Sequence, residues 1–294
     1  MSFLKSRIIG ALLAASLALS GCSTLRLAYN AVPELAYLWL DNLVDFSEEQ
    51  TQQVRDSLAA WFKWNRTTQL DDYAALLARI QTQMPEPMTP ALTCRWFDEL
   101  SARLRLGFEQ AVPAAAELVP SMSASQLQHL ERRYAKRNAE FRSDYLQASP
   151  KERLELSVKR VVDRAELLYG RLDDAQRERI ASAVASSPFD PELWLAERKA
   201  RQRDILQTFG TLLSEQRAPR DTQVAAAQGA LHALARRFER SPRPLYRAYQ
   251  ERLSQYNCAF AADVHNLTTP AQRQVAVGRL KAWETDLRAL AAER

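Results

Sequence analysis

The sequence predicts an all-α fold, on the evidence of its composition, its apolar spacing and its prolines. Seven glycines among 294 residues are few, whereas strand-rich domains need glycine in their turns. The chain is rich in alanine, leucine, arginine, glutamate and glutamine, which favour helix. Apolar side chains recur at helical spacing between prolines and polar caps. We expect about ten mostly antiparallel helices in one helical-bundle-like domain.

The first three expected helices lie before residue 84. Apolar residues at helical spacing predict helices around residues 35–46, 47–61 and 73–80. The stretch "MPEPMTP" at residues 84–90 contains three prolines and predicts a break in the helical pattern. It is therefore a possible sub-boundary within the domain.

A long helix is expected to begin at about Thr89 and to be kinked or ended by Pro113. Its inward face is expected to carry Trp96, Leu100, Leu104 and Phe108. The remaining helices are expected over residues 123–148, 150–170, 173–186, 191–217, 220–240, 244–266 and 270–292.

A short apolar segment follows two positive charges at the N-terminus. Lys5 and Arg7 precede the run Ile8–Leu19, which only Gly10 and Ser16 interrupt. A helix over this run reaches about 18 Å at about 1.5 Å per residue, short of a bilayer core of about 30 Å. The pattern predicts a secretory signal rather than a membrane-spanning helix.

The signal ends in Leu19-Ser20-Gly21-Cys22, which resembles the lipobox of bacterial lipoproteins. The resemblance implies removal of residues 1–21 as a signal peptide and acylation of Cys22, with palmitate among the added chains, at the start of a mature domain over 22–294. Ser23 follows the cysteine, where lipoproteins kept in the inner membrane usually carry Asp. The expected location is therefore the outer membrane, on its periplasmic face, with the membrane as a partner through the lipid anchor. The alternative is ordinary signal cleavage that leaves Cys22 as a free thiol.

The formal net charge of the chain is mild. It is +5, and Lys5 and Arg7 of the signal contribute two of those charges. This balance favours a mixed, solvated surface and no nucleic-acid partner. Three basic clusters stand out, and two that converge could hold an envelope protein or an anionic glycolipid. They are Arg132, Arg133, Lys136 and Arg137; Arg198, Lys199, Arg201 and Arg203; and Arg236, Arg237 and Arg240.

Two cysteines remain after Cys22, namely Cys94 and Cys258. An even pair in an oxidising compartment favours a disulfide. The alternative is two unrelated buried thiols. A bond would tie the region after residues 84–90 to the C-terminal helices, which favours one domain over two.

No motif for catalysis, metal or cofactor is found. His129, His232 and His265 lie far apart, and phosphate-loop and dinucleotide signatures are missing. Asp41 and Asp45 share a helix face and could do acid–base work, but a structural role near a helix cap is favoured. We expect no metal and no cofactor.

One short pattern recurs. In "FSEEQTQQV" (46–54), "MSASQLQHL" (122–130) and "LDDAQRERI" (172–180), Ser or Asp follows an apolar residue, Gln stands three positions later, and an apolar residue four positions after that. "TPAQRQV" (269–275) is a looser copy. The pattern predicts a capping box at a helix start. It is also similar to the LTxxQ motif of the periplasmic chaperones Spy and CpxP, but an ordinary cap is favoured.

Three segments, "LAYN" (27–30), "WLDNLVDFSEEQ" (39–50) and "WFKWNRTTQLDDYAALL" (61–77), resemble an uncharacterised family of Gram-negative outer-membrane lipoproteins. That family usually has histidine where this chain has Asn65, so a mechanism that titrates the histidine would be absent here. The resemblance implies a fold and a location only. The matching positions are Tyr29, Asn30, Trp39, Asp41, Asp45, Gln50, Trp64, Asn65, Arg66, Leu70 and Tyr73.

We therefore expect a non-enzymatic binding, scaffold or assembly protein of the cell envelope. A chaperone like Spy or CpxP is the alternative and would need an exposed apolar concavity between helices. An envelope enzyme ranks third and would need buried carboxylates that converge in a pocket.

Overall fold

The structure is a computed structural model that describes residues 24–147, 149–215 and 217–293. The predicted signal and Cys22 lie outside the described residues. The all-α class is confirmed, since the described residues form helices and none lies in a strand. The elements are α2 (Thr24–Val44), α3 (Glu48–Trp64), η1 (Asn65–Gln69), α4 (Leu70–Gln83), α5 (Pro90–Leu118), η2 (Val119–Ser121), α6 (Ala124–Arg142), η3 (Ser143–Gln147), α7 (Pro150–Tyr169), α8 (Asp174–Ala185), α9 (Pro191–Ser214), α10 (Arg220–Glu239), α11 (Pro244–Asn266) and α12 (Pro270–Ala292).

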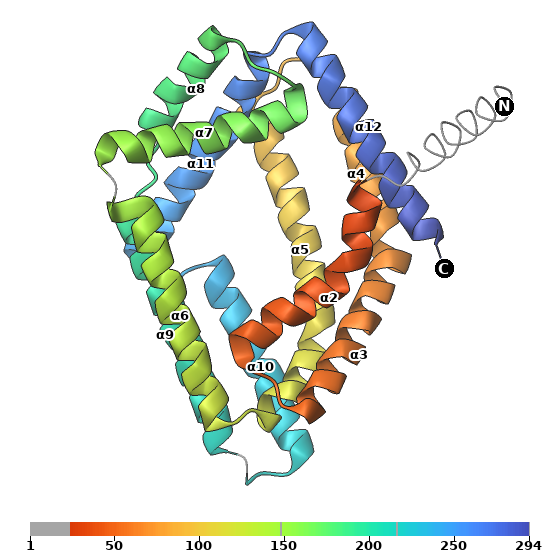
Figure 1. Ribbon diagram of the computed structural model, residues 1–294, viewed down its shortest axis with the longest axis vertical. Helices are drawn as coiled ribbons and strands as arrows, with labels where there is room; N and C mark the ends of the chain where they lie inside the picture. Colours follow the sequence, from red (N-terminus) through yellow and green to blue (C-terminus); the bar gives the residue numbers. More distant parts are fainter. Residues whose placement is uncertain (1–23, 148, 216, 294) are drawn as a thin grey trace, which may run out of the picture.

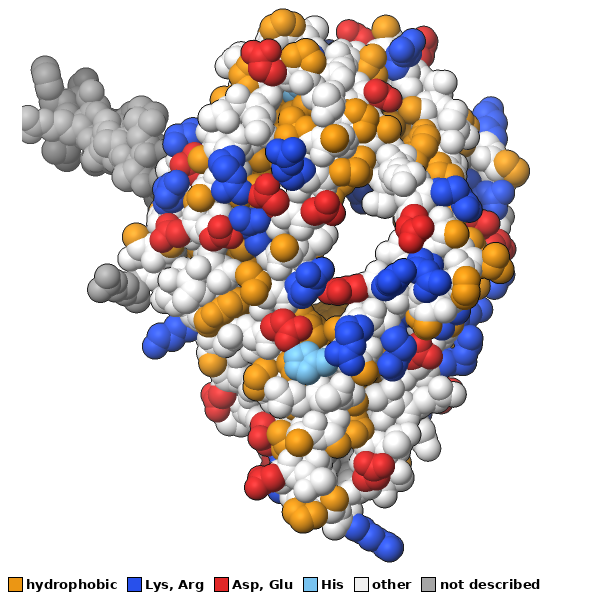
Figure 2. Space-filling view, turned by 180° about the vertical axis from the view of Figure 1, so that it is seen from behind, with side chains coloured by type: hydrophobic (Ala, Val, Ile, Leu, Met, Phe, Trp, Pro, Cys, Tyr) orange, Lys and Arg blue, Asp and Glu red, His pale blue; other side chains and the backbone are white. Residues whose placement is uncertain are grey.

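The helices surround a central opening (Figure 1). Helices α6 and α9 lie side by side on one flank, and α4 packs along α12 on the other. The space-filling view from behind shows that the opening passes through the molecule (Figure 2). None of the helices in the described part of the chain is long and apolar enough to span a bilayer.

All four copies of the recurring pattern form capping boxes. The caps are Ser47, Ser123, Asp173 and Thr269, each of which accepts a hydrogen bond from the backbone of a glutamine three residues later. Because each cap satisfies backbone groups that a helix start leaves unpaired, α3, α6, α8 and α12 begin where the sequence predicts.

The glutamines of these boxes also pair across the fold. Gln50 Nε2 donates to the Ser121 carbonyl at 2.9 Å, and Gln126 Nε2 donates to the Asp45 carbonyl at 2.8 Å. Each amide also hydrogen-bonds the other. This first glutamine corner, Gln50 and Gln126, joins the α2–α3 turn to the turn before α6.

The second glutamine corner, Gln176 and Gln272, repeats this geometry. Gln176 Nε2 donates to the Leu267 carbonyl at 2.8 Å, and Gln272 Nε2 donates to the Arg171 carbonyl at 2.8 Å. In both corners the accepting carbonyl lies two residues before the partner's cap. The second corner joins the α7–α8 turn to the α11–α12 turn.

The main core packs beside the second corner. Its buried members come from α7, the α7–α8 turn, α8, α11, α12 and the segment after α4, and they are Met84, Met88, Val162, Ala165, Tyr169, Leu172, Ile180, Ala262, Ala276 and Leu280. A smaller cluster of Ala116, Val119, Met122 and Ala227 lies beside the first corner.

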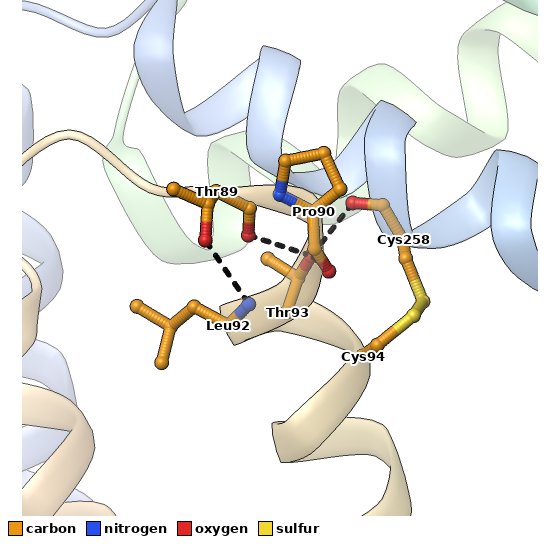
Figure 3. The surroundings of a disulfide bond; sticks show 6 residues. All are labelled: Thr89, Pro90, Leu92, Thr93, Cys94 and Cys258. Carbon is orange, nitrogen blue, oxygen red and sulfur yellow. Dashed lines mark hydrogen bonds between the residues drawn. A yellow bond between two sulfur atoms is a disulfide. The ribbon is translucent and has the colours of Figure 1, made fainter.

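The disulfide favoured by the sequence is present between Cys94 on α5 and Cys258 on α11 (Figure 3). The two Cα atoms lie 5.1 Å apart. Next to it, Thr93 Oγ1 donates to the Cys258 carbonyl at 2.7 Å. The proline-rich segment before α5 is also fixed, because the Met88 backbone exchanges two hydrogen bonds with the Asn266 side chain.

Two expectations for α5 hold only in part. Pro113 does not end the helix, which runs on to Leu118, since a proline removes only one backbone donor. The expected inward face is buried only at its start: Trp96 packs against the main core, whereas Leu100, Leu104 and Phe108 are exposed, Leu104 by 67%. The helix predicted over 123–148 ends at Arg142 and continues as the π-helical segment η3.

Candidate functional site

An apolar cavity of about 800 Å³ lies between α2, α3 and α5. Leu104 and Phe108 of α5, which the sequence analysis placed in a core, belong to its wall. Arg103 is the one charged side chain among the described residues that line it. Its guanidinium holds Asp72 by two hydrogen bonds of 2.7 and 3.0 Å, so the charge is already paired. The lining also includes Leu40, Val54, Trp61, Phe209 and Leu231.

Small residues of α5 make room for this cavity. Gly107, Ala111 and Ala114 all line it. Trp61 Nε1 donates to the Gly107 carbonyl at 2.8 Å, and a Cβ at Gly107 would meet the Trp61 ring at 3.2 Å. The absence of a side chain at Gly107 therefore lets the indole lie against the α5 backbone.

A polar cluster of Tyr29, Asn30, Asn65, Arg66 and Tyr73, here called the tyrosine–asparagine cluster, lies beside the cavity. Tyr29 Oη donates to Asn65 Oδ1 at 2.9 Å, and Asn65 Nδ2 donates to Tyr73 Oη at 3.3 Å. Arg66 Nη2 donates to Asn30 Oδ1 at 2.6 Å. Five of the positions that carried the family resemblance thus meet in space.

The π-helical segment η1 positions two members of this cluster. Asn65 and Arg66 begin η1 between α3 and α4, and π segments within helices are frequent at functional sites. Asn65 is only 5% exposed, and burial raises the pKa of Tyr29. Asn65 thereby holds the hydroxyl groups of Tyr29 and Tyr73 in place.

Sequence reasoning missed one partner of the cluster. Glu293, just beyond α12, lies 3.1 Å from Arg66 and also pairs with Arg26. These hydrogen bonds, that from Arg26 above all, hold the pKa of Glu293 below its usual range. No sequence pattern around Glu293 indicates this contact, because its partners Arg26 and Arg66 lie more than 200 residues earlier in the chain.

The cluster and the cavity share a wall. Tyr73 and Phe62 line the cavity, the Tyr73 hydroxyl accepts from Asn65, and Tyr29 packs edge-on against Phe62 at 6.0 Å between ring centroids. The cluster therefore fixes the side chains at one end of the cavity.

Asp41, Asp45 and Gln50 belong to the first glutamine corner instead. Asp41 Oδ1 accepts from the Phe46 backbone at 3.1 Å. The expectation that Asp41 and Asp45 share a helix face is wrong, because α2 ends at Val44. Asp45 instead adopts a left-handed φ of 63°, which aspartate tolerates better than most residues, and its carbonyl accepts from Gln126. The favoured structural role of these residues agrees with this geometry.

The other motif positions have separate places. Leu70 is in the core, and Trp64 packs against Trp61 at 5.8 Å between ring centroids. Trp39 is 52% exposed, with the Arg137 guanidinium 5.1 Å from its ring centroid.

Two of the three basic clusters share a flank. They lie on α6 and α9, which pack together, and Lys199, Arg203 and Arg142 line one groove there with Glu131. Burial lowers the pKa of Arg198, and the nearby Arg137 lowers it further. The flank therefore carries cations from both clusters.

The described histidines build no metal site. His265 is fully buried, with Nδ1 3.0 Å from Tyr169 Oη and Nε2 2.9 Å from the Glu86 carbonyl. Burial lowers the pKa of His265 and raises the pKa of Tyr169 to about 12. Among the described residues, no group of three metal-ligating side chains comes together.

Glu197 and Glu284 are the buried glutamates among the described residues, and each is paired with basic side chains. Glu197 on α9 pairs with Arg201 and Arg243. Burial works to raise the pKa of Glu197, but these hydrogen bonds outweigh it and lower the pKa. On α12, hydrogen bonds from Gln81, Arg288 and Lys281 lower the pKa of Glu284 to about 2.

Comparison with known proteins identifies a family without an assigned activity. No curated protein and no solved structure matches the chain. A family model matches residues 42–224, more than half of the chain, and covers Asn65, Arg66 and Tyr73. The chain belongs to the family of unknown function DUF6279.

Proposed function

We propose that the protein is a non-enzymatic binding protein of the cell envelope that holds an apolar ligand in the α2–α3–α5 cavity. The observation that carries this proposal is the cavity itself, about 800 Å³ with Arg103 as its one charged lining residue among those described. Its volume is in the range of small-molecule sites, which are mostly apolar. Apolar contact would stabilise a bound ligand by about 25 cal/mol per Å² removed from water.

The proposed location rests on the signal and the lipobox. In this proposal residues 1–21 are removed, acyl chains on Cys22 anchor the protein to the outer membrane, and the domain faces the periplasm. Helix α2, which forms one cavity wall, begins at Thr24. Mass spectrometry of the N-terminal peptide should show an acylated cysteine, and Cys22→Ser should release the protein from membranes. An unmodified Cys22 thiol would refute the anchor.

A fluorescent apolar probe tests the cavity. The full chain carrying Cys22→Ser should bind N-phenylnaphthylamine with enhanced emission. Ala111→Trp adds a large side chain to the cavity wall and should abolish this binding. The matched control is Ala102→Trp, on an exposed position of the same helix, which should bind as before. Equal binding by the Ala111→Trp and Ala102→Trp variants would refute the proposal.

A chaperone like Spy or CpxP is a second candidate, favoured by the same apolar concavity between helices. It predicts that the protein suppresses aggregation of a reduced model protein at near-stoichiometric ratios, and that Ala111→Trp removes the effect. No suppression would eliminate it. An envelope enzyme gains no support from Glu197 and Glu284, since each is paired with its own basic side chains.

The basic flank of α6 and α9 gives the protein a possible second contact, an acidic envelope protein or an anionic glycolipid. Photo-crosslinking in cells from probes near Arg133 and Arg201 should give one discrete adduct. A smear of adducts would favour the chaperone.

A further inference from the structure

A second pocket, of about 880 Å³, lies between α7, η3, the end of α8, the start of α9 and α11. It shares no lining residue with the α2–α3–α5 cavity. One wall is aromatic, formed by Tyr145, Phe189, Trp194, Tyr256 and Phe260. Such a wall offers apolar area at low entropic cost, since aromatic side chains have few rotatable bonds.

The wall formed by α7 is basic. Arg153, Arg160 and Arg164 all line the pocket, and their spacing of seven and four residues places them on one helix face. The Arg160 guanidinium lies 4.4 Å from the centroid of the Tyr145 ring. This stacking leaves the edge of the guanidinium, where its N–H groups lie, free to donate.

On α7, the basic side chains that point away from the pocket form ion pairs. Lys151 pairs with Glu155 and Lys159 pairs with Asp163, at 4.0 and 2.6 Å. By contrast, Arg153, Arg160 and Arg164 form no ion pair with any carboxylate in the part of the chain that the structure describes. Both lysines of α7 are therefore ion-paired, whereas the three guanidinium groups at the pocket have no ion-pair partner among the described carboxylates.

Two carboxylates also line this pocket. Asp144 comes from η3 and Glu192 from α9, so three cations face two anions and the lining carries a net positive charge. A ligand with one anionic group matches this balance, and a guanidinium binds phosphate or carboxylate through two parallel hydrogen bonds.

We propose that this α7 pocket binds an anionic amphiphile, with its phosphate or carboxylate held by Arg153, Arg160 and Arg164. The apolar body of the ligand then lies against the aromatic wall. The site shares no lining residue with the α2–α3–α5 cavity, so an experiment can refute either proposal without refuting the other.

Calorimetric titration of the full chain carrying Cys22→Ser tests this proposal, with dodecyl phosphate below its micellar concentration as the probe. Arg160→Gln and Arg164→Gln should each weaken binding at least tenfold. The matched control is Lys159→Gln, which removes the same charge from the other face of α7 and should change affinity less than twofold. Dodecyltrimethylammonium, with the same tail and the opposite charge, should not bind in the α7 pocket, so any binding of it should be unchanged by Arg160→Gln and Arg164→Gln.

Three results would overturn the proposal. Equal weakening by Lys159→Gln would show attraction by overall charge alone. Loss of binding in Ala111→Trp with none in the arginine variants would place the probe in the α2–α3–α5 cavity. Inorganic phosphate binding as tightly as dodecyl phosphate would show an anion site without an apolar subsite.

Discussion

The two glutamine corners use the same hydrogen bonds but have different surroundings. At the second corner, Ile180 and Ala276 follow their caps into the main core, and both are essentially buried. At the first corner, Val54 follows its cap to the wall of an apolar cavity. The corner itself therefore does not require a cavity. What differs is the packing next to the caps, since the α2–α3–α5 cavity adjoins the first corner, whereas the residues seven positions after the second corner's caps lie in the main core.

The largest effect is expected from breaking either corner. Gln176→Leu and Gln50→Leu each remove a capping contact and leave a carbonyl without its donor, which should cost about 2–3 kcal/mol of unfolding free energy. Urea denaturation measures both. Gln52→Leu is the control, because Gln52 bonds only Asp56 on an exposed surface, and it should cost less than about 0.5 kcal/mol. A small loss at one corner alone would contradict their equivalence.

Enlarging one alanine in each half sharpens the comparison. Ala276 is 0% exposed in the packed core, so Ala276→Leu should destabilise by about 1–3 kcal/mol through overpacking. Ala111 lines the cavity, so Ala111→Leu should change stability by less than about 1 kcal/mol. Thermal denaturation of the two variants checks this. Similar losses in both would mean that the cavity wall is as tightly packed as the core.

The smallest effect is a pH dependence specific to the second half. Because burial lowers the pKa of His265, the unfolded chain takes up a proton below about pH 6.5 while the folded chain does not. Stability should therefore fall as pH decreases from about 6.5, by at most about 1.4 kcal/mol per unit from this group. His265→Gln should flatten the slope of unfolding free energy between pH 7 and 5. An unchanged slope in the variant would refute this role for His265.

Local signals allowed most of the helices to be predicted. Caps, prolines and apolar spacing act within a few residues, so the starts at Ser47, Ser123 and Asp173 could be found directly. The disulfide could be favoured because only Cys94 and Cys258 were left to pair. The local rule that a proline can end a helix did not apply at Pro113, because α5 continues to Leu118.

The candidate site could be found only in part. The positions Asn65, Arg66 and Tyr73 were recognised as a pattern, but the pattern did not reveal that they form a cluster beside a cavity, with Tyr73 in its wall. Paired glutamines lie 76 and 96 residues apart, and no local rule links such distant positions. The signal that could have indicated the cavity is Gly107 with Ala111, small residues among large ones on a long helix.

If the chain is exported as proposed, the disulfide constrains how it folds under oxidising conditions. The chain has three cysteines, and Cys94 must wait for Cys258, 164 residues later, before the native bond can form. During that interval a free thiol at Cys22 would be the nearest competing partner. Acylation at Cys22, as proposed, would remove this competitor and leave a single possible pairing. The lipid would then protect the fidelity of the disulfide as well as hold the protein at the membrane.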